Sequence, residues 1–295
     1  MANVSLPQET VHSMGANIRQ VLRMTKRYVA SYYYSRTERH LFQDVQTYCM
    51  FVGHARSGHS MIGALLDAHP QIVVADEVDT LEYIAAGFSR EQIWHIVLAR
   101  AEKQARKGRT KGGRDGKVYS YHVPDQWQGR FHKLQVIGTS KAGISTQRLA
   151  LQPALLQRLN NTMLDAKVKF VHVIRNPYDT ISTMNLRAGR PLANGIERYF
   201  ANCETLATIR QAVQSTDMFS MKQEDFIADP VTHLQHLCRF LGVEAHEQYI
   251  DACTRILYTS PSKSRQHVQW SPDLIDAVRQ QSARFDFLDG YTYQD

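Results

Sequence analysis

The segment from Gly53 to Ser60 holds the first residues whose types and spacing predict chemistry. Its sequence, GHARSGHS, has the GxxxxGxS spacing of a phosphate-binding loop. In such a loop the glycines let the backbone approach an anion, the amides point inward, and the following helix N-terminus attracts negative charge. The segment therefore predicts an anion site, with contacts expected from Arg56, Ser57, Gly58, His59 and Ser60.

His59 occupies the position at which ATP-binding loops of this spacing carry a lysine. That lysine reaches the β- and γ-phosphates, so a kinase or NTPase without it would be impaired. A nucleotide with a single 5′-phosphate that carries a sulfate has less charge to neutralise, and Arg56 can help to neutralise it. A chance glycine turn is the alternative, which the apolar run before the loop and the helical pattern after it disfavour.

A second candidate anion site follows residues 168–174, VKFVHVI, which are predicted to form a buried strand. Arg175 then stands at the carboxyl end of that strand, where open α/β sheets bind ligands. Asn176 and Pro177 suit the start of a helix. An arginine here can bind a phosphate with two parallel hydrogen bonds. The alternative is an ion pair between Arg175 and Asp179 at the helix start.

The sequence from Arg56 to Pro70, RSGHSMIGALLDAHP, resembles the 5′-phosphosulfate loop and following helix of PAPS-dependent sulfotransferases (PAPS is 3′-phosphoadenosine 5′-phosphosulfate). It is especially similar to the tyrosylprotein sulfotransferases, which have RSGTT and a helix ending in LDAHP; His59 departs from the family's threonine. The resemblance covers roughly residues 48–285. It implies a P-loop-like sulfotransferase architecture, PAPS as co-substrate, PAP (the desulfated nucleotide) as product, and no metal.

The resemblance also implies which residues bind the donor's 3′-phosphate. The family has an arginine at the position of Arg175 and a serine eight residues later, where this chain has Thr183. Arg187 resembles a further phosphate-binding arginine of the tyrosylprotein branch. Ser264 stands near a donor-contacting serine of a C-terminal loop. The neighbouring residues of that loop that could serve the 3′-phosphate instead are Lys263 and Arg265.

Sulfuryl transfer needs a base for the acceptor proton and positive charge for the leaving oxygen. Glu77 follows a short apolar run, at a separation from Arg56 similar to that of the catalytic glutamate in the tyrosylprotein branch. A solvated acidic cluster with its aspartate neighbours is the alternative. His122 is the rival base, because the cytosolic branch uses histidine. Lys141 resembles a family lysine near the transferring group. The residues expected in catalysis are Glu77, Lys141, Arg56 and Ser264.

Apolar runs alternate with helical patterns along the chain. The runs 48–52, 72–75, 134–138 and 168–174 predict strands, and helices are expected near 59–68, 79–86, 89–107, 194–212 and 230–241. Such alternation is typical of an α/β fold with a doubly wound, mostly parallel sheet flanked by helices. The sulfotransferase domain is placed at residues 46–295.

Residues 1–45 are expected to form a helical appendage, rich in Arg, Lys and Tyr. Its Tyr, Val and Leu side chains would pack on the domain; a membrane-surface helix or an arm for a homodimer are the alternatives. Residues 108–117, GRTKGGRDGK, predict a solvated connection or an acceptor-facing lid. The role of both segments stays open.

The composition narrows the function classes. The formal net charge of +7 fits an anionic ligand, but no nucleic-acid motif is present, and no apolar run approaches the roughly 20 residues of a membrane span. Four cysteines without a CxxC pair favour reduced thiols and a cytoplasmic location. The expected function is sulfuryl transfer from PAPS to a hydroxyl or amine of a small metabolite or glycan. A P-loop kinase or NTPase and a non-catalytic PAP-binding protein are the alternatives.

Overall fold

A parallel sheet forms the centre of the protein in the computed structural model, which describes residues 8–112, 118–189 and 191–295. Its five strands lie in the order β2-β5-β1-β6-β7, and every neighbouring pair is parallel. The strands are β1 (Thr47–Gly53), β2 (Ile72–Ala75), β5 (Val136–Thr139), β6 (Lys167–Ile174) and β7 (Met218–Lys222). The predicted α/β fold is confirmed, and the four predicted strands are β1, β2, β5 and β6.

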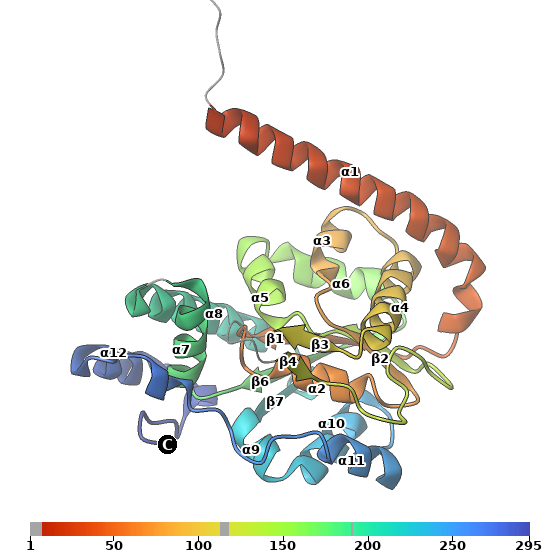
Figure 1. The fold of residues 1–295 in the computed structure, drawn as a ribbon. Helices are drawn as coiled ribbons and strands as arrows, with labels where there is room; N and C mark the ends of the chain where they lie inside the picture. Colours follow the sequence, from red (N-terminus) through yellow and green to blue (C-terminus); the bar gives the residue numbers. More distant parts are fainter. Residues whose placement is uncertain (1–7, 113–117, 190) are drawn as a thin grey trace, which may run out of the picture.

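Helices cover both faces of this sheet (Figure 1). One face carries α3 (Thr80–Ala85), α4 (Arg90–Arg106), α5 (Ala142–Leu151), α6 (Ala154–Met163) and α8 (Leu192–Ala212). The other carries α2 (His59–Leu66), α9 (Gln223–Ala228), α10 (Pro230–Leu241) and α11 (Glu247–Thr254). Beside the sheet lie α7 (Pro177–Ala188) and α12 (Pro272–Ser282).

The central strand β1 shows why the chain folds into three layers. Successive side chains of a strand point to opposite faces. Tyr48 and Met50 accordingly join the apolar cluster under α4 and α8, whereas Cys49 and Phe51 join the cluster under α2 and α10. All four are fully buried, so the continuous apolar run has a partner on each side.

A small hairpin replaces part of the predicted glycine-rich connection. Strand β3 (Thr110–Gly112) pairs antiparallel with β4 (Val118–Ser120). The rest of that connection, residues 113–117, lies outside the described residues. The prediction of an irregular segment is therefore wrong for residues 110–112, because backbone pairing with 118–120 outweighs their low strand propensity.

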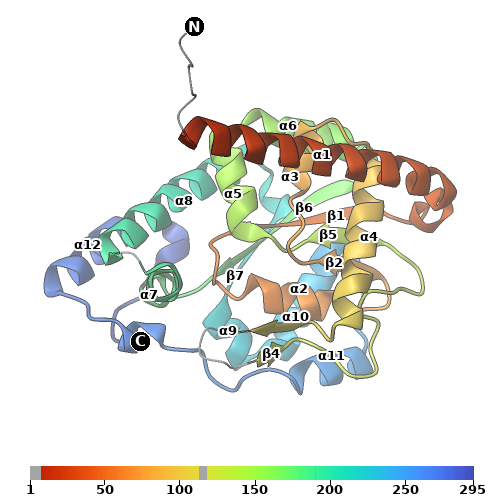
Figure 2. The same cartoon turned by 45° about the horizontal axis from the view of Figure 1, so that its top comes forward.

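The N-terminal helix α1 (Gln8–Thr37) runs along the outside of the helical layer that contains α3 and α4 (Figure 2). Polar and aromatic side chains make its contact with the domain: Ser31 and Ser35 are buried, and Gln92 of α4 donates to the carbonyl of Tyr28 (3.1 Å) and to Ser31 Oγ (3.2 Å). The Tyr28 ring also packs edge-on against Phe88, and the Tyr34 ring stacks on His95. The expectation that its Tyr, Val and Leu side chains pack on the domain holds for these two tyrosines. It is wrong for the exposed residues Val21, Leu22, Val29, Tyr32 and Tyr33.

Two histidines are buried where β1 and β6 end. The ring of His54 stacks on Tyr199 at 3.9 Å between centroids, and its Nε2 lies 2.9 Å from the Tyr199 carbonyl oxygen. Burial lowers the pKa of His54 to about 4, and burial beside His54 lowers the pKa of His172 to about 3. Both rings are therefore neutral in the folded protein near pH 7.

These histidines predict an acid-sensitive fold. An unfolded chain protonates them below about pH 6.5, whereas the folded chain does not until lower pH, so protonation favours unfolding as the pH falls. Between pH 6 and 5 the free energy of unfolding of the wild type should fall about 1.4 kcal/mol per pH unit more steeply than that of His54→Gln. Urea titrations at several pH values measure this. The exposed-site variant His236→Gln should keep the wild-type slope, and an equal slope in His54→Gln would contradict the assignment.

Candidate active site

The loop between β1 and α2 has the backbone of an anion cradle. Gly53 (φ 124°), Arg56 (φ 73°) and Gly58 (φ 96°) all adopt positive φ angles, which turn successive amides toward one side. Gly58 is also the cap residue of α2, and no side chain among the described residues caps that helix. The N-terminus of α2 therefore opens on the loop, which is where a helix favours an anion.

Contacts within the domain hold the loop in this shape. The Ser57 hydroxyl donates to the carbonyl of His54 (3.0 Å) and lies 3.3 Å from His59 Nδ1, so it is used inside the loop. The Gly53 amide donates to Thr146 Oγ1 of α5 (2.8 Å). Arg56 itself is exposed at the loop's outer side. Ser57 and His59, which were predicted to contact the anion, therefore lie in the loop, and their side chains contact each other.

Arg175 joins this loop to two distant segments. Its Nη1 donates to the carbonyl of Arg56 (3.1 Å) and to Thr183 Oγ1 (3.3 Å). Its Nη2 donates to Ser264 Oγ (3.1 Å) and to the carbonyl of Ser262 (2.5 Å). The Thr183 hydroxyl lies 2.9 Å from Ser264 Oγ. Four residues predicted from positions far apart in the sequence therefore meet at one point.

The electrostatics of this cluster favour an anion. Arg175 is 7% exposed, and its Nε has no hydrogen-bond partner among the described residues. Burial lowers the pKa of Arg175, and the negative charges of Asp179 and Glu224 oppose that shift. Partial desolvation lowers the pKa of Arg56, and the positive charge of Arg187 lowers it further. Arg187 is therefore near enough to Arg56 to repel it, and the three arginines contribute positive charge in this region.

Asp179 does not form an ion pair with Arg175. The alternative to a phosphate-binding role for Arg175, an ion pair at the start of the helix, is therefore not what the structure has. The Asp179 carboxylate instead accepts from Arg265, at 3.0 Å from Nε and 2.6 Å from Nη2. Arg265 is 5% exposed and also donates from Nη1 to the carbonyls of Thr292 and Tyr293 (both 3.0 Å). These contacts make Arg265 a structural residue that fixes the 262–267 loop against α7. Its predicted contact with a phosphate has no support in this geometry.

Lys263 lies apart from the Arg175 cluster. Its side chain is exposed, and it lines a cavity of about 220 Å³ together with Asn176 and Lys222. The same cavity also has acidic residues in its wall, among them Glu224 and Asp295. Arg265 also lines this cavity but is 5% exposed and paired with Asp179, whereas the Lys263 side chain is exposed to solvent.

Glu77 and Lys141 meet at the neighbouring strand ends. Glu77 follows β2 and Lys141 follows β5, and Lys141 Nζ lies 3.5 Å from Glu77 Oε2. Glu77 has a positive φ of 62°, an uncommon backbone for a residue other than glycine, and its side chain is half exposed. The Glu77 carboxylate and the Lys141 ammonium group are therefore close together. This is the arrangement expected of a proton acceptor and a cation that act in the same reaction.

The two aspartates beside Glu77 are buried, so this segment is not a solvated acidic cluster. Asp76 is 3% exposed and accepts from Ser60 Oγ (3.3 Å) and Ser140 Oγ (3.2 Å). Asp79 caps α3 and forms a two-pronged ion pair with Arg148. Only the Glu77 carboxylate of the three reaches the exposed side of the segment.

Some residues of the site were not predicted. Gln104 of α4 accepts from the Asp76 amide (2.9 Å) and donates to the Asp76 carbonyl (2.9 Å), which fixes the backbone before Glu77. Gln223 packs so closely on Gly58 that a Cβ there would lie 2.6 Å from its amide nitrogen. A single glutamine on a helix, such as Gln104, gives no sequence signal of such a role.

His122, the rival base, lies on an exposed segment. Its Nδ1 is 3.3 Å from Gln128 Oε1, and Gln128 in turn donates to the Ala64 carbonyl of α2 (2.9 Å). Glu77 has its partner Lys141 at the strand ends, whereas His122 contacts a glutamine. The geometry of the described residues therefore favours Glu77 over His122 as the base.

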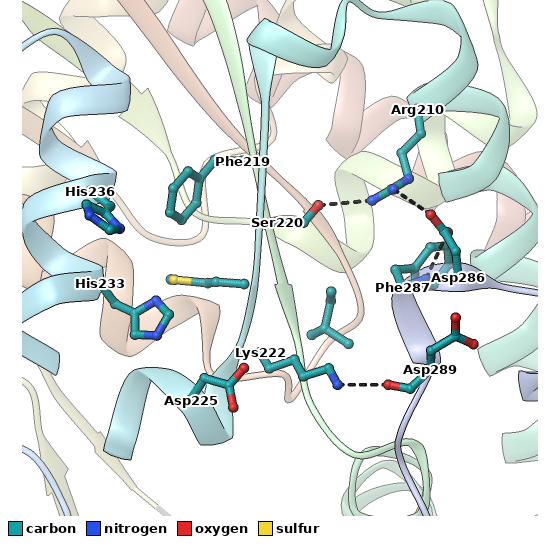
Figure 3. A pocket seen from close by; sticks show the side chains of 12 residues that line it. Arg210, Phe219, Ser220, Lys222, Asp225, His233, His236, Asp286, Phe287 and Asp289 are labelled. Atoms are coloured by element: carbon teal, nitrogen blue, oxygen red, sulfur yellow. Dashed lines mark hydrogen bonds and ion pairs between the residues drawn. The ribbon is translucent and has the colours of Figure 1, made fainter. Parts of the chain in front are cut away.

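A larger cavity of about 550 Å³ lies along the edge strand β7 and is separate from these residues (Figure 3). Figure 3 shows His233 and His236 on one side of the strand and Arg210, Asp286 and Asp289 on the other. None of the predicted site residues lines it. Within the part of the chain that the structure describes, no group of three or more His, Cys, Asp or Glu residues could hold a metal ion.

Comparisons with known proteins identify the family of this chain and proteins with the same fold. A family model described as the sulfotransferase family matches residues 50–247. The sulfotransferase domain of the curacin biosynthetic pathway has the same fold, with a TM-score of 0.52 and 13% identity over 82% of this chain and 98% of that domain. The sulfotransferase domain of the Synechococcus PCC 7002 olefin synthase has a TM-score of 0.48 and 18% identity, over 80% and 89%. No curated protein sequence gives a match.

The structural role of Arg265 predicts a large loss of stability on its removal. Arg265→Ala leaves the buried Asp179 carboxylate without its charged partner, which should lower the free energy of unfolding by about 3–5 kcal/mol. Denaturant titration measures the loss. The matched control is Lys263→Ala, an exposed cation of the same loop, which should change stability by less than about 0.5 kcal/mol. Equal effects of the two substitutions would contradict the structural role.

Proposed function

Because this chain belongs to the sulfotransferase family, we propose that it transfers a sulfuryl group from PAPS to an acceptor and releases PAP. The observation that carries the proposal is the contact between the anion loop and the Arg175 cluster. PAPS has a sulfated phosphate at its 5′ end and a phosphate at its 3′ position. A site for it therefore needs two anion-binding groups joined at a short distance.

The 5′-phosphosulfate would bind at the loop from Gly53 to Gly58. Backbone amides of the loop and of the first turn of α2 are its expected donors, and Arg56 supplies charge from the outer side. The side chain of His59, which replaces the lysine of ATP-binding loops, lies against Ser57. A triphosphate would lack the cation it requires at that position, which favours a nucleotide of lower charge.

The 3′-phosphate would bind at Arg175, Thr183 and Ser264. The two hydroxyl groups already contact Arg175 and each other, and a hydroxyl hydrogen can rotate toward an incoming phosphate oxygen. The buried Arg175 Nε is one more donor without a partner in the described chain. The folded protein already stabilises the buried guanidinium of Arg175. An incoming phosphate would therefore bind to a preorganised set of donors. Lys263 is the accessible cation of the adjoining loop.

Transfer would proceed by in-line attack of the acceptor oxygen or nitrogen on the sulfur atom. The new bond forms as the bond between sulfur and the 5′-phosphate oxygen breaks, and the acceptor proton passes to the Glu77 carboxylate. The negative charge that collects on the leaving phosphate is met by Lys141, Arg56 and the loop amides. The 3.5 Å contact between Glu77 and Lys141 would hold the two groups side by side during the transfer.

A small metabolite or a glycan is the acceptor class that we propose. The resemblance to the tyrosylprotein branch concerns the residues of the donor site and extends to no acceptor-binding residue. The half-exposed Glu77 carboxylate makes the base accessible to a hydroxyl or amine from solvent. A screen of such acceptors with radiolabelled PAPS identifies the substrate through the labelled product.

The two anion-binding groups predict the effect of single substitutions on PAP binding. Arg175→Ala and Arg56→Ala should each weaken PAP binding about 100-fold or more, because a charged hydrogen-bond donor to a phosphate is lost. Arg175→Lys, which keeps the charge, should recover only part of the affinity. Calorimetry measures the dissociation constants, with the exposed Arg279→Ala as control. Unchanged affinity in both alanine variants would refute the site.

The base assignment predicts a loss of rate without a loss of donor binding. Glu77→Gln should lower kcat about 100- to 10,000-fold, since the amide accepts no proton, while PAP affinity stays near that of the wild type. The matched control is Glu82→Gln, because the Glu82 carboxylate points to Gln20 of α1 (3.0 Å). Single-turnover transfer from radiolabelled PAPS provides the rates. A Glu77→Gln variant as fast as Glu82→Gln would assign the base elsewhere.

A further inference from the structure

The outer side of α1 carries large apolar and aromatic side chains that are exposed to solvent. These residues are Val21 (63% exposed), Leu22 (56%), Val29 (64%), Tyr32 (46%) and Tyr33 (66%). Isolated exposed apolar residues are ordinary on a protein surface, but a continuous stripe on one helix indicates a binding surface.

The spacing of these residues puts three of them on the side of the helix that faces away from the domain, with Val21 and Tyr32 on one flank. At 100° per residue, Leu22, Val29 and Tyr33 lie within about 40° of one another. Ser31 and Ser35, which are buried against the domain, lie on the opposite side. The helix therefore contacts the domain through the side that carries Met24, Tyr28, Ser31 and Ser35, and leaves a second set of apolar side chains exposed.

Between Gln20 and Thr37, the charge of this helix is of one sign. The segment from Gln20 to Thr37 has four basic residues and no acidic residue. Arg23 pairs with Glu82 of α3 and Arg27 contacts the Tyr83 hydroxyl, so these two hold the helix on the domain. The other two, Lys26 and Arg36, are exposed beside the apolar stripe, and the Arg36 guanidinium lies 4.6 Å from the centre of the Tyr32 ring.

We propose that this face of α1, from Val21 to Arg36, docks on the surface of an anionic lipid bilayer. Tyrosine rings suit the boundary between headgroups and acyl chains, and lysine and arginine side chains reach from there to lipid phosphates. Apolar burial and attraction to anionic lipids then act together, as they do for interfacial helices. A second copy of this chain is the poorer occupant, because pairing two such faces would bring Lys26 and Arg36 together with no acidic residue to offset them.

The helix would lie in the plane of the membrane surface. Among the described residues, no helix is both long and apolar enough to cross a bilayer. Thirty residues extend about 45 Å, which places the whole stripe along one surface. The contacts of Arg23 and Arg27 are with α3, which begins three residues after Glu77. The proposed surface is therefore attached directly to the segment that holds the base.

Sedimentation of the full chain with lipid vesicles tests this proposal. The wild type should sediment with phosphatidylcholine vesicles that contain phosphatidylserine, and only weakly with phosphatidylcholine alone. Leu22→Glu with Val29→Glu removes the apolar stripe, and Lys26→Glu with Arg36→Glu reverses the charge; each pair should weaken binding at least about tenfold. Val231→Glu, at an exposed position of α10 on the other side of the sheet, is the matched control and should bind as the wild type does.

Two further measurements keep the outcomes distinct. Equal unfolding midpoints show that the variants are folded, as expected since the substituted side chains face away from the domain. Light scattering without vesicles reports the oligomeric state. Wild-type protein that stays in the supernatant with anionic vesicles overturns the proposal, and so does vesicle binding that both double variants retain. A dimer that Leu22→Glu with Val29→Glu disperses would also overturn it and assign the face to a second copy.

Discussion

The buried guanidinium of Arg175 is the interaction on which the rest of the site depends. It donates to the carbonyl of Arg56 in the anion loop, to Thr183 on α7 and to Ser264 in the C-terminal loop. A charge this deeply buried is stable only while each partner stays in place. The ion pair between Asp179 and Arg265 fixes α7 to the C-terminal loop. Because Asp179 is paired in this way, the Arg175 guanidinium is available to contact all three segments.

The parallel sheet explains why this junction and the pair of Glu77 and Lys141 lie at one edge. Carboxyl ends of parallel strands meet on the same side, and β1, β2, β5 and β6 each end there in a loop with polar side chains. Strands β1, β2, β5 and β6 could be predicted from continuous apolar runs, whereas the edge strand β7 (Met218–Lys222) was not among those runs. The family resemblance implied that Arg56, Arg175, Thr183 and Ser264 serve the donor, and the structure adds that they meet at one point. The catalytic roles of Glu77 and Lys141 stay predictions that their 3.5 Å contact supports.

What could not be predicted depends on contacts between segments far apart in the chain. Gln104 holds the backbone of Asp76 from 28 residues away, and Arg265 reaches Asp179 across 86 residues. Neither residue type nor spacing distinguishes such partners from surface residues. The same limit applies to α1: its pattern predicts a helix with an apolar side, but which side contacts the domain depends on Gln92 and Glu82 of other helices.

The relative affinities of the wild-type protein for PAP and for AMP test the central claim most directly. The two nucleotides share the adenosine and the 5′-phosphate and differ in the 3′-phosphate that Arg175, Thr183 and Ser264 are proposed to bind. Calorimetry should show PAP binding about 100-fold more tightly than AMP, because the charged hydrogen bonds of the second anchor are lost with AMP. Equal dissociation constants would contradict the account.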